Sequence, residues 1–197
     1  MRLVNLVGTR CTDGNLAALR AWYTDHVHQL MACEGLLEAR LWLREGATRG
    51  AASDTEEGAG KGAVEGDAPE CLCLYDFESA AAFAEYESGP VRASAGADRA
   101  LGWGHKGIEI TMRYTLTRLY RRSGPATPPS RWHVRSLRAG SEVHRALVAG
   151  IDADVELYLS RGEPTSILVF SAADSALPAG ALPAWAADYA PVMQWSR

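Results

Sequence analysis

His26 is the residue whose position in the sequence points most directly to chemistry. It lies four residues after Trp22 and four before Leu30, so in a helix its imidazole shares the apolar stripe and points at the covered surface. Burial lowers the pKa of an imidazole, which then acts near pH 7 as a neutral base or positions a carbonyl oxygen. A core histidine satisfied by a neighbouring polar group explains the same spacing. Both interpretations stay open at this point.

Aromatic side chains and a second histidine supply candidates for substrate binding. The candidates are Trp22, Tyr23, Tyr75, Phe77, Trp103 and His105. Trp22 and Tyr23 are adjacent and therefore about 100° apart on a helix, so they cannot both face one pocket, and Trp22 is the better placed. Tyr75 and Phe77 project to one side of a strand. Trp103 and His105 lie in a Gly-rich segment that lets backbone approach a ligand. For all of them, core packing or a surface turn is the competing interpretation.

Metal and cofactor chemistry receives little support. His28 and Asp25 share an outer helix face, but a metal site needs a further ligand and none is in view. Cys71 and Cys73 lack the spacing of zinc sites and are expected to be buried, reduced thiols. No phosphate-binding loop, serine triad or paired catalytic carboxylate follows from the spacing. We therefore predict no metal and no cofactor, with haem ligation by a histidine left as an alternative that no motif supports.

Composition excludes several classes of protein. The chain has 197 residues, 47% of them hydrophobic and 22% charged, which excludes a mainly disordered chain. The formal charge of −4 argues against a nucleic-acid partner. No apolar run has the length of a membrane span, and the first residues become polar too soon for a secretory signal. We expect a cytoplasmic protein with neither nucleic-acid nor membrane partners.

Periodicity predicts an α+β domain over residues 1–122. Helices are expected from 16 to 33, ended by Gly35, and after Glu78 and Ser79, with Pro90 breaking the second. A flexible loop is expected over 46–70, with a lid as the alternative. Strands are expected at 3–11, 36–44, 71–77 and 107–120. This β-α-β-β-α-β order predicts a ferredoxin-like sheet with both helices on one face, and a homodimer is the simplest cover for the other face.

Beyond this domain, a Pro-rich linker is expected at 123–130. Residues 131–197 are then predicted to form a C-terminal βαβ-type partial repeat. Its elements are a strand at 132–137, a helix at 141–160 and a strand at 165–172.

Charged residues gather at two places in the predicted sheet. In the strand at 36–44, Glu38, Arg40 and Trp42 share one face, so an aromatic ring lies on the side of the charges. Four arginines near the end of the strand at 107–120 are expected to form a solvated rim or to pair with the acidic loop, with anion binding as the alternative. These are Arg113, Arg118, Arg121 and Arg122.

Three segments resemble the dimeric α/β-barrel superfamily, and more closely the proteins related to ethyl tert-butyl ether degradation and neighbouring uncharacterised families. They are 22–30, with its aromatic pair, acid and histidine, 34–40, with its glycine, and 72–79, with its Tyr-acid pair. The resemblance covers residues 1–122, and His28 stands where many relatives have proline. It implies a homodimer with an apolar pocket between sheet and helices for a hydrophobic or aromatic small molecule.

The leading hypothesis is therefore a small-molecule-binding protein that acts as a cofactor-independent monooxygenase, cyclase or isomerase on an aromatic or polyketide-like metabolite. His26 is its candidate acid or base. The alternative is a non-catalytic ligand-binding or structural dimer in which His26 is only packed. Fold alone does not decide between them.

Overall fold

In a computed structural model, the described residues form one closed barrel of eight antiparallel strands, with two helices on its outer side. The structure describes residues 2–11, 15–46, 68–93, 108–121, 130–138, 155–160, 166–172 and 183–197. The expected loop at 46–70 and the linker at 123–130 lie almost entirely outside these residues.

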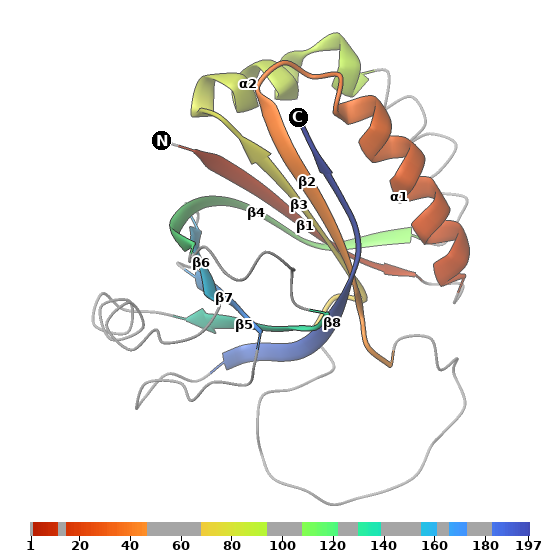
Figure 1. Ribbon diagram of the computed structural model, residues 1–197, viewed down its shortest axis with the longest axis vertical. Helices are drawn as coiled ribbons and strands as arrows, with labels where there is room; N and C mark the ends of the chain where they lie inside the picture. The colour runs from red at the N-terminus through yellow and green to blue at the C-terminus, as the bar shows by residue number, and fades with distance from the viewer. Residues whose placement is uncertain are drawn as a thin grey trace, which may run out of the picture.

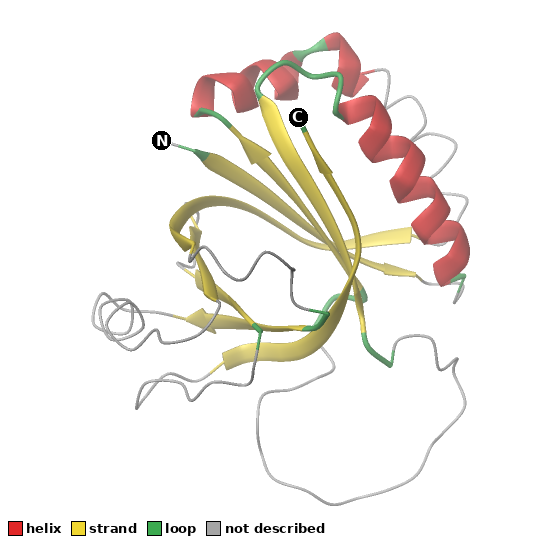
Figure 2. Cartoon of the chain, in the orientation of Figure 1, coloured by secondary structure: helices red, strands yellow, loops and turns green. Residues whose placement is uncertain are grey.

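The strands and helices alternate in the first part of the chain, whereas only strands are described in the second (Figures 1 and 2). Around the barrel the strands follow the order β1-β3-β2-β8-β5-β7-β6-β4. The elements are β1 (Leu3–Cys11), α1 (Leu16–Leu30), β2 (Leu36–Arg44), β3 (Cys71–Phe77), α2 (Ala80–Ser88), β4 (Ile108–Arg121), β5 (Trp132–Arg138), β6 (Val155–Ser160), β7 (Ser166–Ser171) and β8 (Pro183–Ser196).

The barrel consists of two halves with the same strand arrangement. The first half has the order β4-β1-β3-β2, and the second has the corresponding order β8-β5-β7-β6. The halves are joined where β2 pairs with β8 and where β4 pairs with β6. The chain's own second half thus covers the sheet face for which the sequence suggested a second subunit. The ferredoxin-like description, the homodimer and the division into two domains stay predictions.

The C-terminal part differs from its sequence-based prediction. The helix expected at 141–160 is wrong for its last six residues, which form the strand β6, and residues 141–154 lie outside the described part. Residues 155–160 also alternate at every second position, and pairing with β4 and β7 favours that period over the helical one. The long strand β8 was not predicted at all, because its alanines and prolines are poor strand signals.

The two helices begin where capping residues predict. The Asn15 side chain accepts a hydrogen bond from the Ala18 backbone at 3.0 Å, and Ser79 caps α2 through Ala82 at 3.1 Å. Helix α1 ends at Leu30, three residues earlier than expected, and the chain then turns at Gly35, whose φ is +78°. Helix α2 ends at Ser88, just before the predicted break at Pro90.

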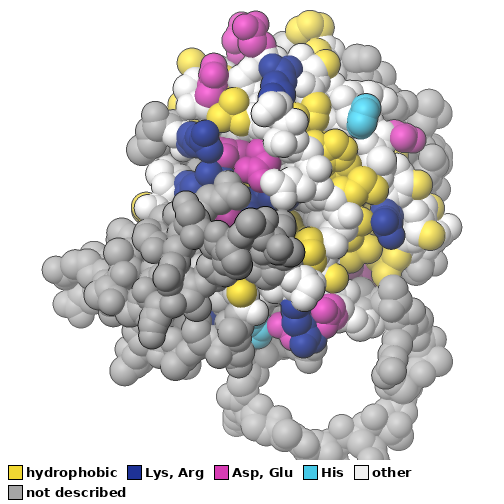
Figure 3. Space-filling model, in the orientation of Figure 1, with side chains coloured by type: hydrophobic (Ala, Val, Ile, Leu, Met, Phe, Trp, Pro, Cys, Tyr) yellow, Lys and Arg dark blue, Asp and Glu magenta, His cyan; other side chains and the backbone are white. Residues whose placement is uncertain are grey.

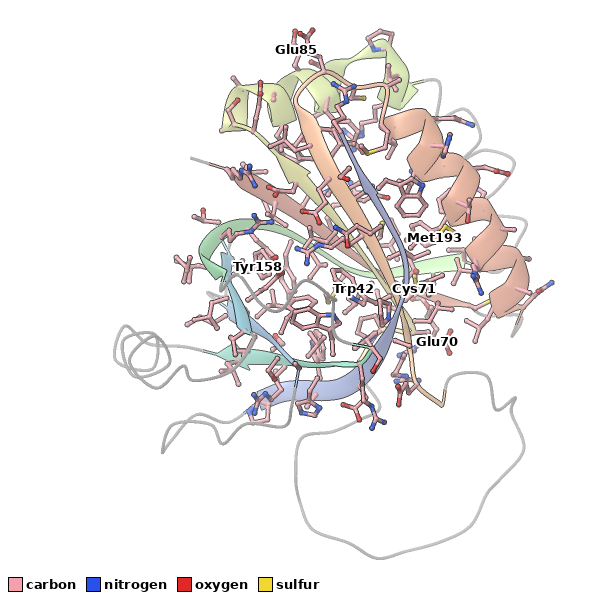
Figure 4. All side chains as sticks on the ribbon, in the orientation of Figure 1. Trp42, Glu70, Cys71, Glu85, Tyr158 and Met193 are labelled. Carbon is pink, nitrogen blue, oxygen red and sulfur yellow. The ribbon has the colours of Figure 1, made fainter. Side chains whose placement is uncertain are left out.

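Alternation along the strands produces two cores. One lies between the helices and the outer sheet face, and we call it the helix–sheet layer; it includes Tyr23, Val27, Leu41, Tyr75 and Phe77. The other fills the barrel interior with side chains of both halves, among them Leu6, Trp42, Tyr158, Leu168 and Phe170. In Figure 4, Trp42 and Tyr158 point into this interior. The predicted pocket residues of β3 therefore lie outside the barrel, beneath the helices.

Candidate functional site

His26 lies on the buried face of α1, as the helical spacing predicts. It is 9% exposed, and its ring stacks on Trp22 with centroids 4.6 Å apart and planes inclined by 14°. Trp22 is half-buried and packs against the helix–sheet layer. Met193 of β8 lies close by, since its sulfur is 3.6 Å from the Thr24 hydroxyl. Hydrophobic side chains gather on the surface between α1 and β8 (Figure 3). Trp22 and Met193 are only partly buried where they pack against the layer, so the layer reaches solvent at these residues.

Two tyrosines bring polar atoms into the layer. Tyr23 is buried, and its hydroxyl lies 3.4 Å from the Thr9 hydroxyl. Burial raises the pKa of Tyr23 and of Tyr75 well above the ordinary value for a phenol. Both side chains therefore stay protonated at neutral pH, when each is a hydrogen-bond donor. Trp22 and Tyr23, expected to face different spaces, differ in exposure, but their rings are in edge-to-face contact with centroids 4.9 Å apart.

Phe77 belongs to a different part of the layer. Its ring lies 5.2 Å from Phe83 and 5.0 Å from Tyr86, both on α2. Such spacing is typical of aromatic packing in a core. The structure thus brings Trp22, Tyr23 and His26 together on α1 and sets Phe77 beneath α2. Trp103 and His105 lie outside the described residues.

Asn5 is a candidate that sequence analysis missed. It lies opposite Tyr75 in the register of β1 and β3, and it alternates with Val4 and Leu6 of the barrel interior, so its side chain faces the helices. Asn5 is 4% exposed, and its Oδ1 atom accepts no hydrogen bond from any described residue. An asparagine in an otherwise apolar strand was the available signal. It gives the helix–sheet layer an acceptor suited to a ligand donor.

All four cysteines are buried and form no disulfide, so the predicted burial of Cys71 and Cys73 is confirmed. Cys71 and Cys73 lie in the same layer, and burial raises the pKa of Cys73 to about 12. Thiolate is the reactive form, so a raised pKa makes the thiol slow to react.

We expect native protein to resist thiol-specific reagents at pH 8. Because the Cys73 thiol ionises only near pH 12, its alkylation rate should still rise about tenfold per pH unit at pH 10. An ordinary thiol would level off near pH 9. Mass spectrometry of iodoacetamide-treated protein measures this, with denaturant-unfolded protein as the control in which all four cysteines react. A plateau for Cys73 near pH 9 would contradict a raised pKa.

A second polar cluster, also missed from the sequence, lies inside the barrel. Arg40 of β2 binds Glu156 of β6 through two contacts, Nη1 to Oε1 at 2.9 Å and Nη2 to Oε2 at 2.8 Å. Arg40 Nη2 also donates to the Tyr158 hydroxyl at 2.8 Å, and Nε lies 3.4 Å from Glu38 Oε1. Three strands separate β2 from β6 in either direction, so Arg40 reaches across the barrel. Burial alone would lower the Arg40 pKa, but Tyr158 and Glu156 outweigh it and raise the pKa.

Arg118 completes this cluster and corrects a prediction. It was expected on a solvated rim, yet its side chain is 11% exposed and Nη2 binds Asp76 Oδ2 at 2.7 Å. It faces the interior because it alternates with Leu116 along β4. Arg2, whose side chain is 53% exposed, lies 3.4 Å from the same Asp76 oxygen. Burial raises the Asp76 pKa, and the two arginines partly offset this.

The described part of the chain has neither a cluster that fits a metal ion nor a helix that fits a membrane. Among those residues, no group of three or more His, Cys, Asp or Glu is placed to hold a metal ion. Neither α1 nor any other described helix has the length and apolar character needed to cross a membrane.

Known structures resemble this barrel, although the sequence itself matches no family model and no curated protein. Two are described as "putative monooxygenase". The one from Fusobacterium nucleatum has TM-score 0.60 and 8% identity, with 100% of this chain and 94% of that chain covered. The one from Lactobacillus acidophilus has TM-score 0.52 and 6% identity, covering 99% and 96%. An "anthrone oxidase-like protein" has TM-score 0.61 and 11% identity, covering 99% and 92%. The barrel fold, with both halves in one chain, is therefore shared.

Proposed function

We propose that this protein binds a hydrophobic or aromatic small molecule in the helix–sheet layer. In this proposal it acts as a cofactor-independent monooxygenase, cyclase or isomerase on an aromatic or polyketide-like metabolite. The observation that carries the proposal is the buried Asn5 Oδ1 atom without a described hydrogen-bond partner, in the same layer as His26. The names of the structural neighbours, monooxygenase and anthrone oxidase-like protein, agree with a substrate of this class.

Each side chain has a role in this proposal. Trp22 and Met193 provide an apolar entrance, where a flat ring stacks beside Trp22. Asn5 accepts a hydrogen bond from the substrate. His26 removes a proton from the substrate, a step that the three reaction types share. In an isomerase or cyclase it returns the proton to the product; in a monooxygenase O2 is the oxidant, and the proton goes to the oxygen atom that leaves as water. Burial keeps Tyr23 and Tyr75 protonated, so both are hydrogen-bond donors. The Tyr23 hydroxyl donates to the Thr9 hydroxyl in the structure, and in this proposal it donates to a substrate oxyanion in place of Thr9.

A thermal-shift screen of aromatic and polyketide-like metabolites tests this proposal, with wild type, His26→Ala and His28→Ala in parallel. His28 is exposed on the same helix and serves as the matched control. A ligand at 100 times its Kd should raise the melting temperature by about 5–10 °C. We expect this shift in wild type and His28→Ala, and at least tenfold weaker binding in His26→Ala.

Two other outcomes would redirect the interpretation. If His26→Ala melts lower but keeps the ligand shift, His26 is a core residue and the non-catalytic alternative applies. If no metabolite shifts wild type, the proposed substrate class is wrong.

A further inference from the structure

The charged end of the barrel carries chemistry that the proposed function does not use. We define this charged end by Arg2, Glu38, Arg40, Asp76, Arg118 and Glu156. It lies on the inner side of the sheet, whereas the proposed substrate site lies on the outer side. Basic and acidic side chains gather next to one another near the start of β1 in Figure 3.

The ion pair between Arg118 and Asp76 is made by one atom on each side. Arg118 Nη2 meets Asp76 Oδ2 at 2.7 Å, and Arg2 approaches the same oxygen. Asp76 Oδ1 and Arg118 Nε have no hydrogen-bond partner among the described residues, although both atoms are buried. The Asp76 side chain is 0% exposed. A bidentate ion pair through Nε and Nη2, an arrangement that arginine and carboxylate groups favour, would have satisfied both atoms.

The unsatisfied atoms define the ligand group that fits them. Oδ1 of a carboxylate needs a donor, and Nε–H of a guanidinium needs an acceptor. Each atom is two covalent bonds from the contact between Arg118 Nη2 and Asp76 Oδ2, so one group placed beside that contact can reach both. A hydroxyl group donates one hydrogen bond and accepts others, so a single hydroxyl satisfies both.

Charge balance decides whether that ligand is charged. Three arginines face three carboxylates at this end of the barrel, and each cation already has an anionic neighbour. A ligand carrying a net charge would leave that charge uncompensated among buried groups, which is strongly unfavourable. Arg2, whose side chain is 53% exposed, contacts Asp76 and connects the pair to the protein surface.

We propose that the charged end of the barrel binds a small neutral alcohol or phenol, whose hydroxyl group donates to Asp76 Oδ1 and accepts from Arg118 Nε. This site is separate from the helix–sheet layer. It depends neither on His26 nor on the reaction proposed for that layer.

Three probes of matched shape test the proposal on the full chain. Phenol donates and accepts a hydrogen bond, anisole only accepts, and toluene does neither. Titration calorimetry should give the affinity order phenol, anisole, toluene, with phenol at least tenfold tighter than toluene because hydrogen bonds to charged groups are strong. Benzoate, an anion of similar size, should not bind. Equal binding of phenol and toluene, or no saturable phenol binding, would overturn the proposal and leave water as the partner of both atoms.

Variants then assign the site. Arg118→Lys keeps the positive charge beside Asp76 but removes the Nε–H donor, and it should weaken phenol binding at least tenfold. Arg131→Lys is the matched control, because Arg131 is exposed and pairs with Glu45 and Asp188 elsewhere on the barrel. It should bind phenol as wild type does. If Arg118→Lys fails to fold, the probe series on wild type still decides whether the hydroxyl group is recognised.

Asn5→Leu separates this proposal from the proposed function. It removes the acceptor in the helix–sheet layer and should leave phenol binding at the charged end unchanged. If phenol binding is lost in Asn5→Leu and kept in Arg118→Lys, phenol occupies the helix–sheet layer and the barrel-end proposal is wrong. Failure of the metabolite screen with His26 has no bearing on the phenol series.

Discussion

Replacing Arg40 by methionine should lower the free energy of unfolding by about 3–5 kcal/mol. The guanidinium makes two contacts with Glu156 and another with Tyr158, and the side chains of Arg40, Glu156 and Glu38 are all less than one-tenth exposed. Methionine fills much of the same volume but leaves two carboxylates in the barrel without their cation. The cost is mainly that of uncompensated buried charge. Equilibrium unfolding in urea, followed by tryptophan fluorescence, measures it.

Arg131→Met is the control for this experiment. Its side chain is 55% exposed, so its ion pairs are screened by water and their loss should cost about 1 kcal/mol or less. A second variant tests the cause. Adding Glu156→Leu to Arg40→Met should recover part of the lost stability, because it removes one of the two carboxylates that Arg40→Met leaves without a cation. Strictly additive losses would show that packing around Arg40, rather than its charge, is what matters.

Replacing Gly35 by alanine should lower the free energy of unfolding by about 2–5 kcal/mol, almost as much as the change at Arg40. Gly35 has φ of +78°, a conformation that costs an alanine energy at any site. A Cβ atom there would lie 2.4 Å from the Cβ of Ala82 on α2. The turn between α1 and β2 would then have to move away from α2. Urea unfolding again gives the magnitude.

Gly46→Ala isolates the contribution of the backbone. Gly46 has nearly the same φ, +82°, but no atom lies within 4 Å of the position a Cβ would take. Gly46→Ala should therefore lower the free energy of unfolding by about 1 kcal/mol. The difference between the two variants then measures the clash with Ala82. Equal losses of unfolding free energy in the two variants would mean that α2 moves away from the added Cβ atom at no free-energy cost.

Much of the first half was predictable because its signals are local. The capping residues Asn15 and Ser79, the spacing on α1 and the alternation in β2 each depend on a few neighbouring residues. The second half was harder to predict. In β6 the helical and strand periods coincide over part of the segment, and the partner strands that decide between them lie far away in the sequence. Tertiary pairing overrode the local pattern.

The candidate sites divide in the same way. The position of His26 on the buried face of α1 follows from spacing alone, and so does the shared face of Glu38, Arg40 and Trp42. The partner of Arg40 does not, since Glu156 is 116 residues further along the chain. The contact of Arg118 with Asp76 could not be predicted until the barrel placed β4 near β3 across β1. A local pattern predicts which way a side chain points, but not what meets it there.

The joining of β2 to β8 has a consequence for how the chain folds. Gln194 contacts Glu38, which lies 156 positions earlier in the chain, so this pairing closes a very long loop and contributes to a high contact order. On the ribosome, β1 to β4 emerge well before β8 and form a sheet with two open edges and an uncovered apolar face. Open edges of this kind pair readily with other chains. We therefore expect the first half on its own to be prone to association with other chains until β8 closes the barrel.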